Sequence, residues 1–316
     1  MKNKFVRIGA VLLALTLLSG ACGSDDEGGI DGELTFALIN GVLTGRESVC
    51  AFSGAKHAVE QAGHKWVESS SVYNLDDELG LINAAITQGV DVIFIWGAFP
   101  QSGRRGVSLA KNAGIPIYLF FNEVPLVTED ILGSSLYDFR GSGANVGVWI
   151  AENRPNGVIL ELTGSPGSGT AEAISQGIVD GIAGSNAVVK QRENANWSAD
   201  DSASLAATLL PTNPDVNLVI THNDTMALAV QRVIDDLGLT GSVEVLTESV
   251  SSPAGLQAVE DGVIPMPNAV DPLAQYGENA ANHALALLAG ETDERFRLMG
   301  PNFVDPKNPG TFCYGE

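Results

Sequence analysis

Short apolar runs alternate with longer amphipathic segments along most of the chain. Six of the runs have the length and composition of buried strands: residues 34–40, 91–97, 115–121, 157–164, 217–223 and 243–249. After each run, apolar residues three and four positions apart predict a helix, and several of these segments end in a glycine that suits a left-handed cap: Gly63, Gly89, Gly114 and Gly238. The regular alternation predicts an α/β fold with helices on both faces of parallel sheets, and the number of strands favours two similar lobes.

The first residues follow a different pattern. Three basic residues, Lys2, Lys4 and Arg7, precede an apolar run over residues 8–18 and then small residues that lead to Cys22. This arrangement predicts an export signal over residues 1–21, because the apolar run is shorter than the roughly 20 residues of a spanning helix. The glycine-rich, acidic residues 22–32 predict a flexible tether.

The small residues before Cys22 resemble the lipobox of bacterial lipoproteins. This resemblance implies that Cys22 is lipidated and becomes the first residue of the mature chain, although Ser19 stands where the usual leucine is found. An ordinary secretory signal is the alternative. The membrane is expected to be a partner only through this lipid anchor, on the periplasmic or outer side of the cell membrane.

The net charge and the cysteines indicate which partners and which covalent links the protein can have. The chain has 17 Lys and Arg against 38 Asp and Glu, a formal net charge of -21, which argues against nucleic acid as a partner. With Cys22 assigned to lipid, Cys50 and Cys313 remain as a pair in an oxidising compartment. They predict a disulfide, with two buried thiols as the alternative.

Several segments resemble the type I periplasmic substrate-binding proteins of sugar ABC transporters, the ribose-binding-protein-like group. The most specific are "NPDVNLVITHNDTMALA" (213–229) and the strand entry "AGIPI" (113–117), and the resemblance covers nearly all of residues 33–295. It implies two doubly wound lobes, joined by a three-strand hinge, that close on a small molecule. The N-terminal lobe is expected at 33–137 plus 271–300 and the C-terminal lobe at 138–270 plus 301–316.

The same resemblance implies a set of ligand contacts. Asn223 lies at a strand–helix junction where the family's asparagine reaches the ligand, and Asp224 is then expected to cap the following helix; the alternative is a cap at Asn223 itself. Trp197 falls where the family places an aromatic ring over the apolar face of a sugar. The complete set of predicted ligand-binding residues is Arg46, Glu47, Trp96, Phe99, Phe121, Asn122, Trp197, Asn223, Glu248 and Asp271.

Each of these predictions has a plainer alternative. Trp96 and Trp197 could pack in the core or a loop, and Glu248 and Asp271 could face solvent. Phe121 and Asn122 stand where sugar binders commonly have Asp-Arg, which predicts a ligand smaller, less polar or differently oriented than a ribose-like pentose, with Arg46 and Glu47 as partial compensation. The glycine-rich loop at 164–170 lacks the ending of a phosphate loop and is expected to frame the cleft, before a helix that begins at Ser168 or Thr170.

An enzyme is the hypothesis that the sequence supports least. The four histidines, His57, His64, His222 and His283, have no metal-ligand spacing, and no serine lies in a G-x-S-x-G elbow. We therefore expect no cofactor, no metal ion and no catalysis. The prediction is a monomeric solute-binding lipoprotein that delivers a sugar or polyol to an ABC permease. A nucleoside-binding protein of the same fold and a ligand sensor for a membrane signalling protein are the alternatives.

Overall fold

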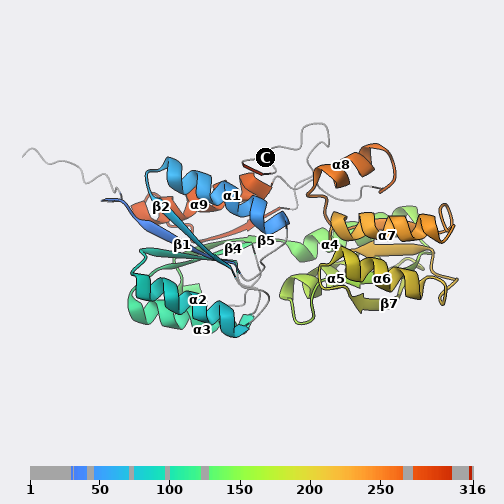
Figure 1. Cartoon of the computed structure of the whole chain (residues 1–316), viewed down its shortest axis with the longest axis horizontal. Helices are drawn as coiled ribbons and strands as arrows, with labels where there is room; N and C mark the ends of the chain where they lie inside the picture. The colour runs from blue at the N-terminus through green and yellow to red at the C-terminus, as the bar shows by residue number, and fades with distance from the viewer. Residues whose placement is uncertain are drawn as a thin grey trace, which may run out of the picture.

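A computed structural model describes residues 30, 32–40, 46–70, 75–96, 100–121, 128–265, 273–300 and 313–314. Within these residues the chain forms two lobes, each built on one sheet (Figure 1). The first sheet has the strand order β10-β5-β4-β3-β1-β2 and the second has the order β7-β6-β8-β9. Every pairing in both sheets is parallel. The predicted α/β fold with parallel sheets in two lobes is confirmed.

The first lobe carries two helices on each face of its sheet, with α1 and α9 on one face and α2 and α3 on the other (Figure 1). Its central strands β1, β3 and β4 are buried because they consist almost entirely of apolar residues, as in "VIFIW" of β3. The elements are β1 (Thr35–Asn40), α1 (Arg46–Gln61), β2 (Lys65–Ser70), α2 (Leu75–Gln88), β3 (Val92–Trp96), α3 (Pro100–Ala113), β4 (Ile117–Phe121), η1 (Thr128–Asp130), β5 (Gly133–Tyr137), α9 (Leu273–Ala289) and β10 (Phe296–Met299).

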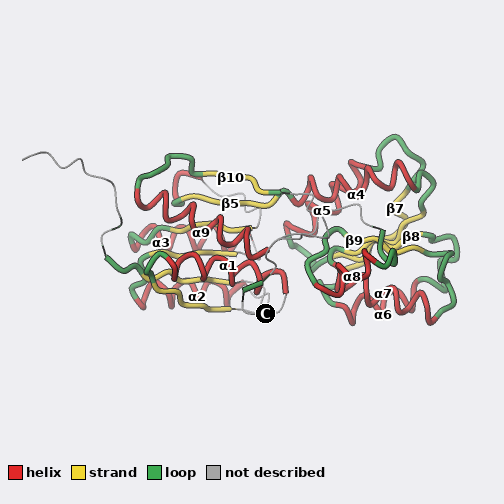
Figure 2. The backbone as a smooth tube through the Cα atoms, turned by 90° about the horizontal axis from the view of Figure 1, so that it is seen from above, coloured by secondary structure: helices red, strands yellow, loops and turns green. Residues whose placement is uncertain are grey.

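The second lobe has the same alternating order. Its elements are α4 (Phe139–Asn153), β6 (Val158–Thr163), α5 (Gly169–Gly181), β7 (Val188–Asn194), α6 (Ala199–Leu209), β8 (Leu218–Thr221), α7 (Asp224–Asp236), β9 (Glu244–Thr247) and α8 (Pro253–Glu260). Helices α4 and α5 lie side by side because glycines let their backbones meet (Figure 2). A Cβ at Gly143 would lie 2.2 Å from the Ile174 oxygen, and one at Gly177 would lie 2.1 Å from the Arg140 oxygen.

The described connection between the lobes runs from β5 into α4. Strand β5 ends at Tyr137, and Asp138 caps α4 by accepting a hydrogen bond from the Gly141 N–H at 2.8 Å. Strand β10 returns to the first sheet beside β5, where the Asp138 N–H donates to the Met299 oxygen at 3.1 Å. The predicted crossovers near Asp271 and Pro301 lie outside the described residues.

The C-terminus is fastened to the first lobe. Cys313 forms a disulfide with Cys50 of α1, which confirms the predicted pair. The ring of Tyr314 stacks on His57 with centroids 4.2 Å apart, and its hydroxyl donates to Glu278 of α9 at 2.9 Å. The predicted lobe boundary assigns residues 301–316 to the C-terminal lobe, whereas Cys313 and Tyr314 lie against α1, because the disulfide and the stacked ring hold them there.

Candidate functional site

The predicted residues Trp197, Asn223 and Glu248 lie at one edge of the second sheet. Parallel pairing brings the carboxyl ends of β6, β7, β8 and β9 together, and each of these three residues follows one of those strands. The Ser142 hydroxyl, in the first turn of α4, donates a hydrogen bond to Glu248. This edge therefore lies beside the crossover from the first lobe, and we call it the interlobe edge, defined by Gly164, Trp197, Asn223 and Glu248.

Asn223 is the N-cap of α7. Its Oδ1 accepts hydrogen bonds from the Met226 N–H at 2.9 Å and the Thr225 hydroxyl at 2.8 Å. The prediction that Asp224 caps this helix is wrong, because the extended backbone of Asn223 places its own oxygen over the first turn. Within the described part of the chain, the NH₂ group of Asn223 has no hydrogen-bond partner, so both of its donors remain for a bound molecule.

Asp224 instead holds the loop before α8. The buried carboxylate accepts hydrogen bonds from the backbone N–H groups of Ser251 and Ser252, at 3.2 and 2.9 Å, and from the Ser252 hydroxyl at 2.6 Å. Burial raises the pKa of Asp224, and the hydrogen bonds from Ser252 and Ser251 only partly oppose this shift. A Cβ at Gly255 would lie 2.0 Å from Asp224 Oδ2, so the first turn of α8 is built around this side chain.

Trp197 occupies a strained backbone conformation. Its φ is 61° and that of Asn196 is 54°, in the left-handed region that non-glycine residues rarely adopt. The flanking groups hold this turn, since the Ser198 N–H donates to the Ala195 oxygen at 2.7 Å and Asn196 Nδ2 donates to Asp201 at 2.9 Å. A strained residue that its surroundings fix in place is typical of a functional site.

The indole of Trp197 contacts His222 and Gly164. Its ring centroid lies 5.6 Å from that of His222, and its Nε1, Cε2 and Cζ2 atoms lie against the backbone of Gly164. Nε1 is buried and has no hydrogen-bond partner among the residues that the structure describes. The sequence alone predicts the ring at this position but not its fixed orientation.

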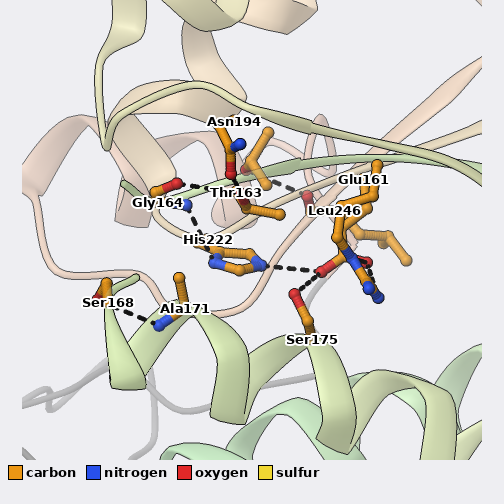
Figure 3. A network of polar contacts seen from close by, with 11 residues as sticks. Glu161, Thr163, Gly164, Ser168, Ala171, Ser175, Asn194, His222 and Leu246 are labelled. Carbon is orange, nitrogen blue, oxygen red and sulfur yellow. Dashed lines mark hydrogen bonds and ion pairs between the residues drawn. The ribbon is translucent and has the colours of Figure 1, made fainter. Parts of the chain in front are cut away.

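A buried polar network, absent from the sequence prediction, lies directly beneath this edge (Figure 3). Glu161, in the middle of β6, is completely buried and accepts hydrogen bonds from His222 Nε2 at 3.0 Å, the Ser175 hydroxyl at 2.5 Å and Arg192 Nε at 2.8 Å. Burial alone would raise the pKa of Glu161, but the contacts with His222, Ser175 and Arg192 outweigh it and lower the pKa. The sequence contains one sign of this network, the single acidic residue within the apolar run "VILELT", because a buried carboxylate needs hydrogen-bond partners.

The first-lobe candidates are described in part. Trp96 is 7% exposed and packs edge-on against Phe52 and Phe120, with centroids 5.3 and 5.8 Å away, so most of its surface lies in the core. The backbones of Arg46 and Glu47 begin α1 and that of Phe121 ends β4, but their side chains are not among those described. Phe99, Asn122, Asp271 and the lipidation candidate Cys22 lie outside the described residues, so their roles stay predictions.

In the described part of the chain, no group of three or more His, Cys, Asp or Glu side chains could hold a metal ion. None of the helices in those residues is long and apolar enough to cross a membrane.

Comparison with known proteins identifies the family. Residues 48–292 match the family described as Periplasmic binding protein domain. The chain belongs to this family. Its members are exported substrate-binding proteins of transport systems, which agrees with the two-lobed fold and with the resemblance found in the sequence.

Relatives of this periplasmic binding protein match over nearly their whole length. The ribose import binding protein RbsB of Salmonella typhimurium is 25% identical, over 92% of this chain and 94% of its own. The fructose import binding protein FruE of Bifidobacterium longum is 26% identical, over 93% and 92%. A solute-binding protein structure from Mycobacterium smegmatis with bound glycerol superposes with a TM-score of 0.77 at 20% identity, over 88% of this chain and 96% of that chain, and shows the shared fold.

Proposed function

We propose that the protein captures a small neutral polar solute, a sugar or a polyol, between its two lobes and delivers it to an ABC permease. The interlobe edge is the observation that carries this proposal. It presents the aromatic ring of Trp197, which contacts His222, and the NH₂ group of the adjoining residue Asn223, which has no hydrogen-bond partner among the described residues. An aromatic face suits the C–H face of a sugar or polyol, and amide donors suit its hydroxyl oxygens. Named sugar and polyol binders among the relatives, such as the xylitol-binding protein of Mycolicibacterium smegmatis, support the same solute class.

The proposed protein acts by binding and lobe closure, without a chemical step. Lobe closure would bring the first-lobe candidates, from Arg46 to Asn122, against the solute held at the interlobe edge. Ionisable groups of the network beneath that edge are engaged with one another, as Glu161 is with His222 and Arg192. Such groups support a rigid site and are not poised to transfer a proton to a bound molecule.

Thermal unfolding of residues 23–316 tests the solute class. We expect one member of a panel of D-ribose, D-fructose, xylitol, myo-inositol, glycerol and adenosine to raise the unfolding midpoint, because a molecule that binds only the folded state stabilises it by about 2.7 kcal/mol at 100 times its Kd. Trp197→Ala should abolish the shift. A shift with adenosine alone would indicate that the solute is a nucleoside and not a sugar. The absence of a shift with every member of the panel would contradict the proposed class.

We also propose that Cys22 carries lipid and holds the mature protein at the membrane surface. The acidic, glycine-rich residues 22–32 would then act as a spacer between the anchor and the lobes. Fractionation of cells that express the wild type and Cys22→Ser tests this role. The wild type should sediment with membranes and the variant should not. Equal distribution of the two would leave an ordinary secretory signal as the better explanation.

A further inference from the structure

The ring of His222 contacts three separate segments of the second lobe. Nδ1 lies 3.4 Å from the Gly164 nitrogen, after β6, and Nε2 lies 3.0 Å from Glu161 Oε1, within β6. The ring face packs against Trp197, which follows β7. The contacts of His222 with Gly164 and Glu161 are seen in Figure 3. Because His222 immediately precedes Asn223, the N-cap of α7, one side chain links the backbone of Gly164 and the indole of Trp197 to the start of that helix.

The hydrogen bonds fix which way the ring faces. The Gly164 N–H can only donate, so Nδ1 is the acceptor and the proton lies on Nε2, which donates to Glu161. Glu161 cannot turn away, because Ser175 of α5 and Arg192 of β7 hold its two oxygens. The imidazole is therefore fastened at both nitrogens and has one orientation.

Trp197 depends on this orientation. Its left-handed backbone is unfavourable for a tryptophan, and its Nε1 gains no hydrogen bond from any residue that the structure describes. Two contacts within the site support the indole, one with the imidazole of His222 and one with the bare backbone of Gly164, and the indole also packs against the apolar core. A ring that rotated at position 222 would remove the first of these two supports.

We propose that His222 is a positioning residue for solute capture: its ring, fastened by Glu161 and Gly164, sets the orientation of the Trp197 indole relative to the Asn223 amide. The role of these two groups in binding rests on the proposed function. The orientation of the indole does not, because it is a property of the protein without solute. His222 contributes to specificity in this way without touching the solute.

Indole N–H resonances of the solute-free protein test the positioning directly. Trp197→Phe identifies the Trp197 resonance in a ¹⁵N–¹H spectrum. His222→Ala should shift this resonance and leave those of Trp66, Trp96 and Trp149 in place. The variant is expected to fold, because Glu161 keeps Ser175 and Arg192 as partners. His222→Gln, which retains a donor toward Glu161, should shift the resonance less, and an unmoved Trp197 resonance in His222→Ala would overturn the proposal.

Titration with D-ribose and with xylitol gives the second readout. We expect His222→Ala to weaken binding of the effective probe at least tenfold, and Ile234→Ala to leave it unchanged within twofold. Ile234 is a matched control, because it is fully buried in the same helix that Asn223 caps and has no contact with the network. Equal affinity of wild type and His222→Ala would overturn the role in capture. If the wild type binds neither probe, the indole spectrum alone decides the positioning, and the solute class is decided by the full panel of the unfolding test.

Discussion

The indole of Trp197 lies against the backbone of Gly164 so closely that a Cβ at position 164 would come within 2.0 Å of Cε2. Only glycine leaves room for the ring there. The next nearest atoms to that Cβ are Cζ2 at 2.3 Å and Nε1 at 2.4 Å of the same indole. All three nearest atoms therefore belong to Trp197, and a side chain at position 164 would collide with this ring first.

Gly164→Ala should therefore displace Trp197 and weaken solute binding. Crowding of this kind costs about 1–3 kcal/mol, which corresponds to a loss of affinity of roughly 5- to 150-fold if the indole contacts the solute. Calorimetric titration with the effective solute measures the loss. Gly80→Ala is the matched control, since a Cβ at Gly80 meets no atom within 4 Å. Wild-type affinity in Gly164→Ala would exclude Trp197 from the binding surface.

Glu161→Gln should lower the free energy of unfolding at neutral pH. It should also make that free energy depend less on pH in acid. The pKa of Glu161 is lowered in the folded state, so its stabilising effect is present above the unfolded pKa and is lost as pH falls below about 4.5. Glutamine carries no negative charge and has one acceptor oxygen in place of two, so hydrogen bonds to the carboxylate that are worth about 1.5–3 kcal/mol each are weakened or lost. Urea unfolding measured at several pH values checks both effects. A variant whose stability falls as steeply in acid as that of the wild type would refute this account.

Asp224 should show the opposite dependence on pH. Its pKa is raised by burial, so the folded state binds the proton more tightly than the unfolded state does, and stability falls as pH rises above about 3.8. Asp224→Asn keeps an acceptor oxygen for Ser251 and Ser252. Because asparagine does not titrate, this variant should lack the fall in stability with rising pH. Asp224→Ala leaves their donors unpaired and should cost about 1–3 kcal/mol. The same urea series measures both variants, and similar stabilities for Asn and Ala at position 224 would show that the hydrogen bonds contribute little.

Gly277→Ala should destabilise the first lobe. Helices α1 and α9 touch through their backbones, and a Cβ at Gly277 would lie 1.7 Å from the Ala51 oxygen. A carbonyl oxygen cannot rotate away as a side chain can, so the helices must separate at a cost of about 1–3 kcal/mol or more. Calorimetric melting should show a midpoint several degrees below that of the wild type, with Gly80→Ala again as control. An unchanged midpoint would mean that the helices are not held at this distance.

Six of the strands could be predicted because most of their residues are apolar and buried. The run 157–164 corresponds to Val158–Thr163 and the run 243–249 to Glu244–Thr247. Strands β2 and β7 escaped prediction because each is an edge strand with a largely polar sequence, "KWVESS" and "VVKQREN". Strand β5, "GSSLY", is a buried strand made mostly of small residues, and tertiary contacts such as that between Ser135 and the Tyr118 hydroxyl at 2.6 Å explain its burial.

The candidate site could be predicted from the sequence only in part. The motif "THNDTM" predicts the position of the strand–helix junction. It does not predict which residue caps the helix, because Asn223 and Asp224 are both suitable cap residues. Backbone geometry decides between them, and it assigns the cap to Asn223 and the α8 loop to Asp224. The network of Glu161 could not be predicted, since Ser175, Arg192 and His222 come from separate elements that only the folded sheet brings together.

The bond between Cys50 and Cys313 joins positions 263 residues apart. The covalent ring that it closes contains the whole second lobe and every strand of the first lobe except β1. A protease that cuts one peptide bond anywhere inside this ring therefore opens the ring but releases no fragment. The nicked chain stays a single molecule until a reductant reaches the sulfurs, so damage in the extracytoplasmic space need not separate the two lobes.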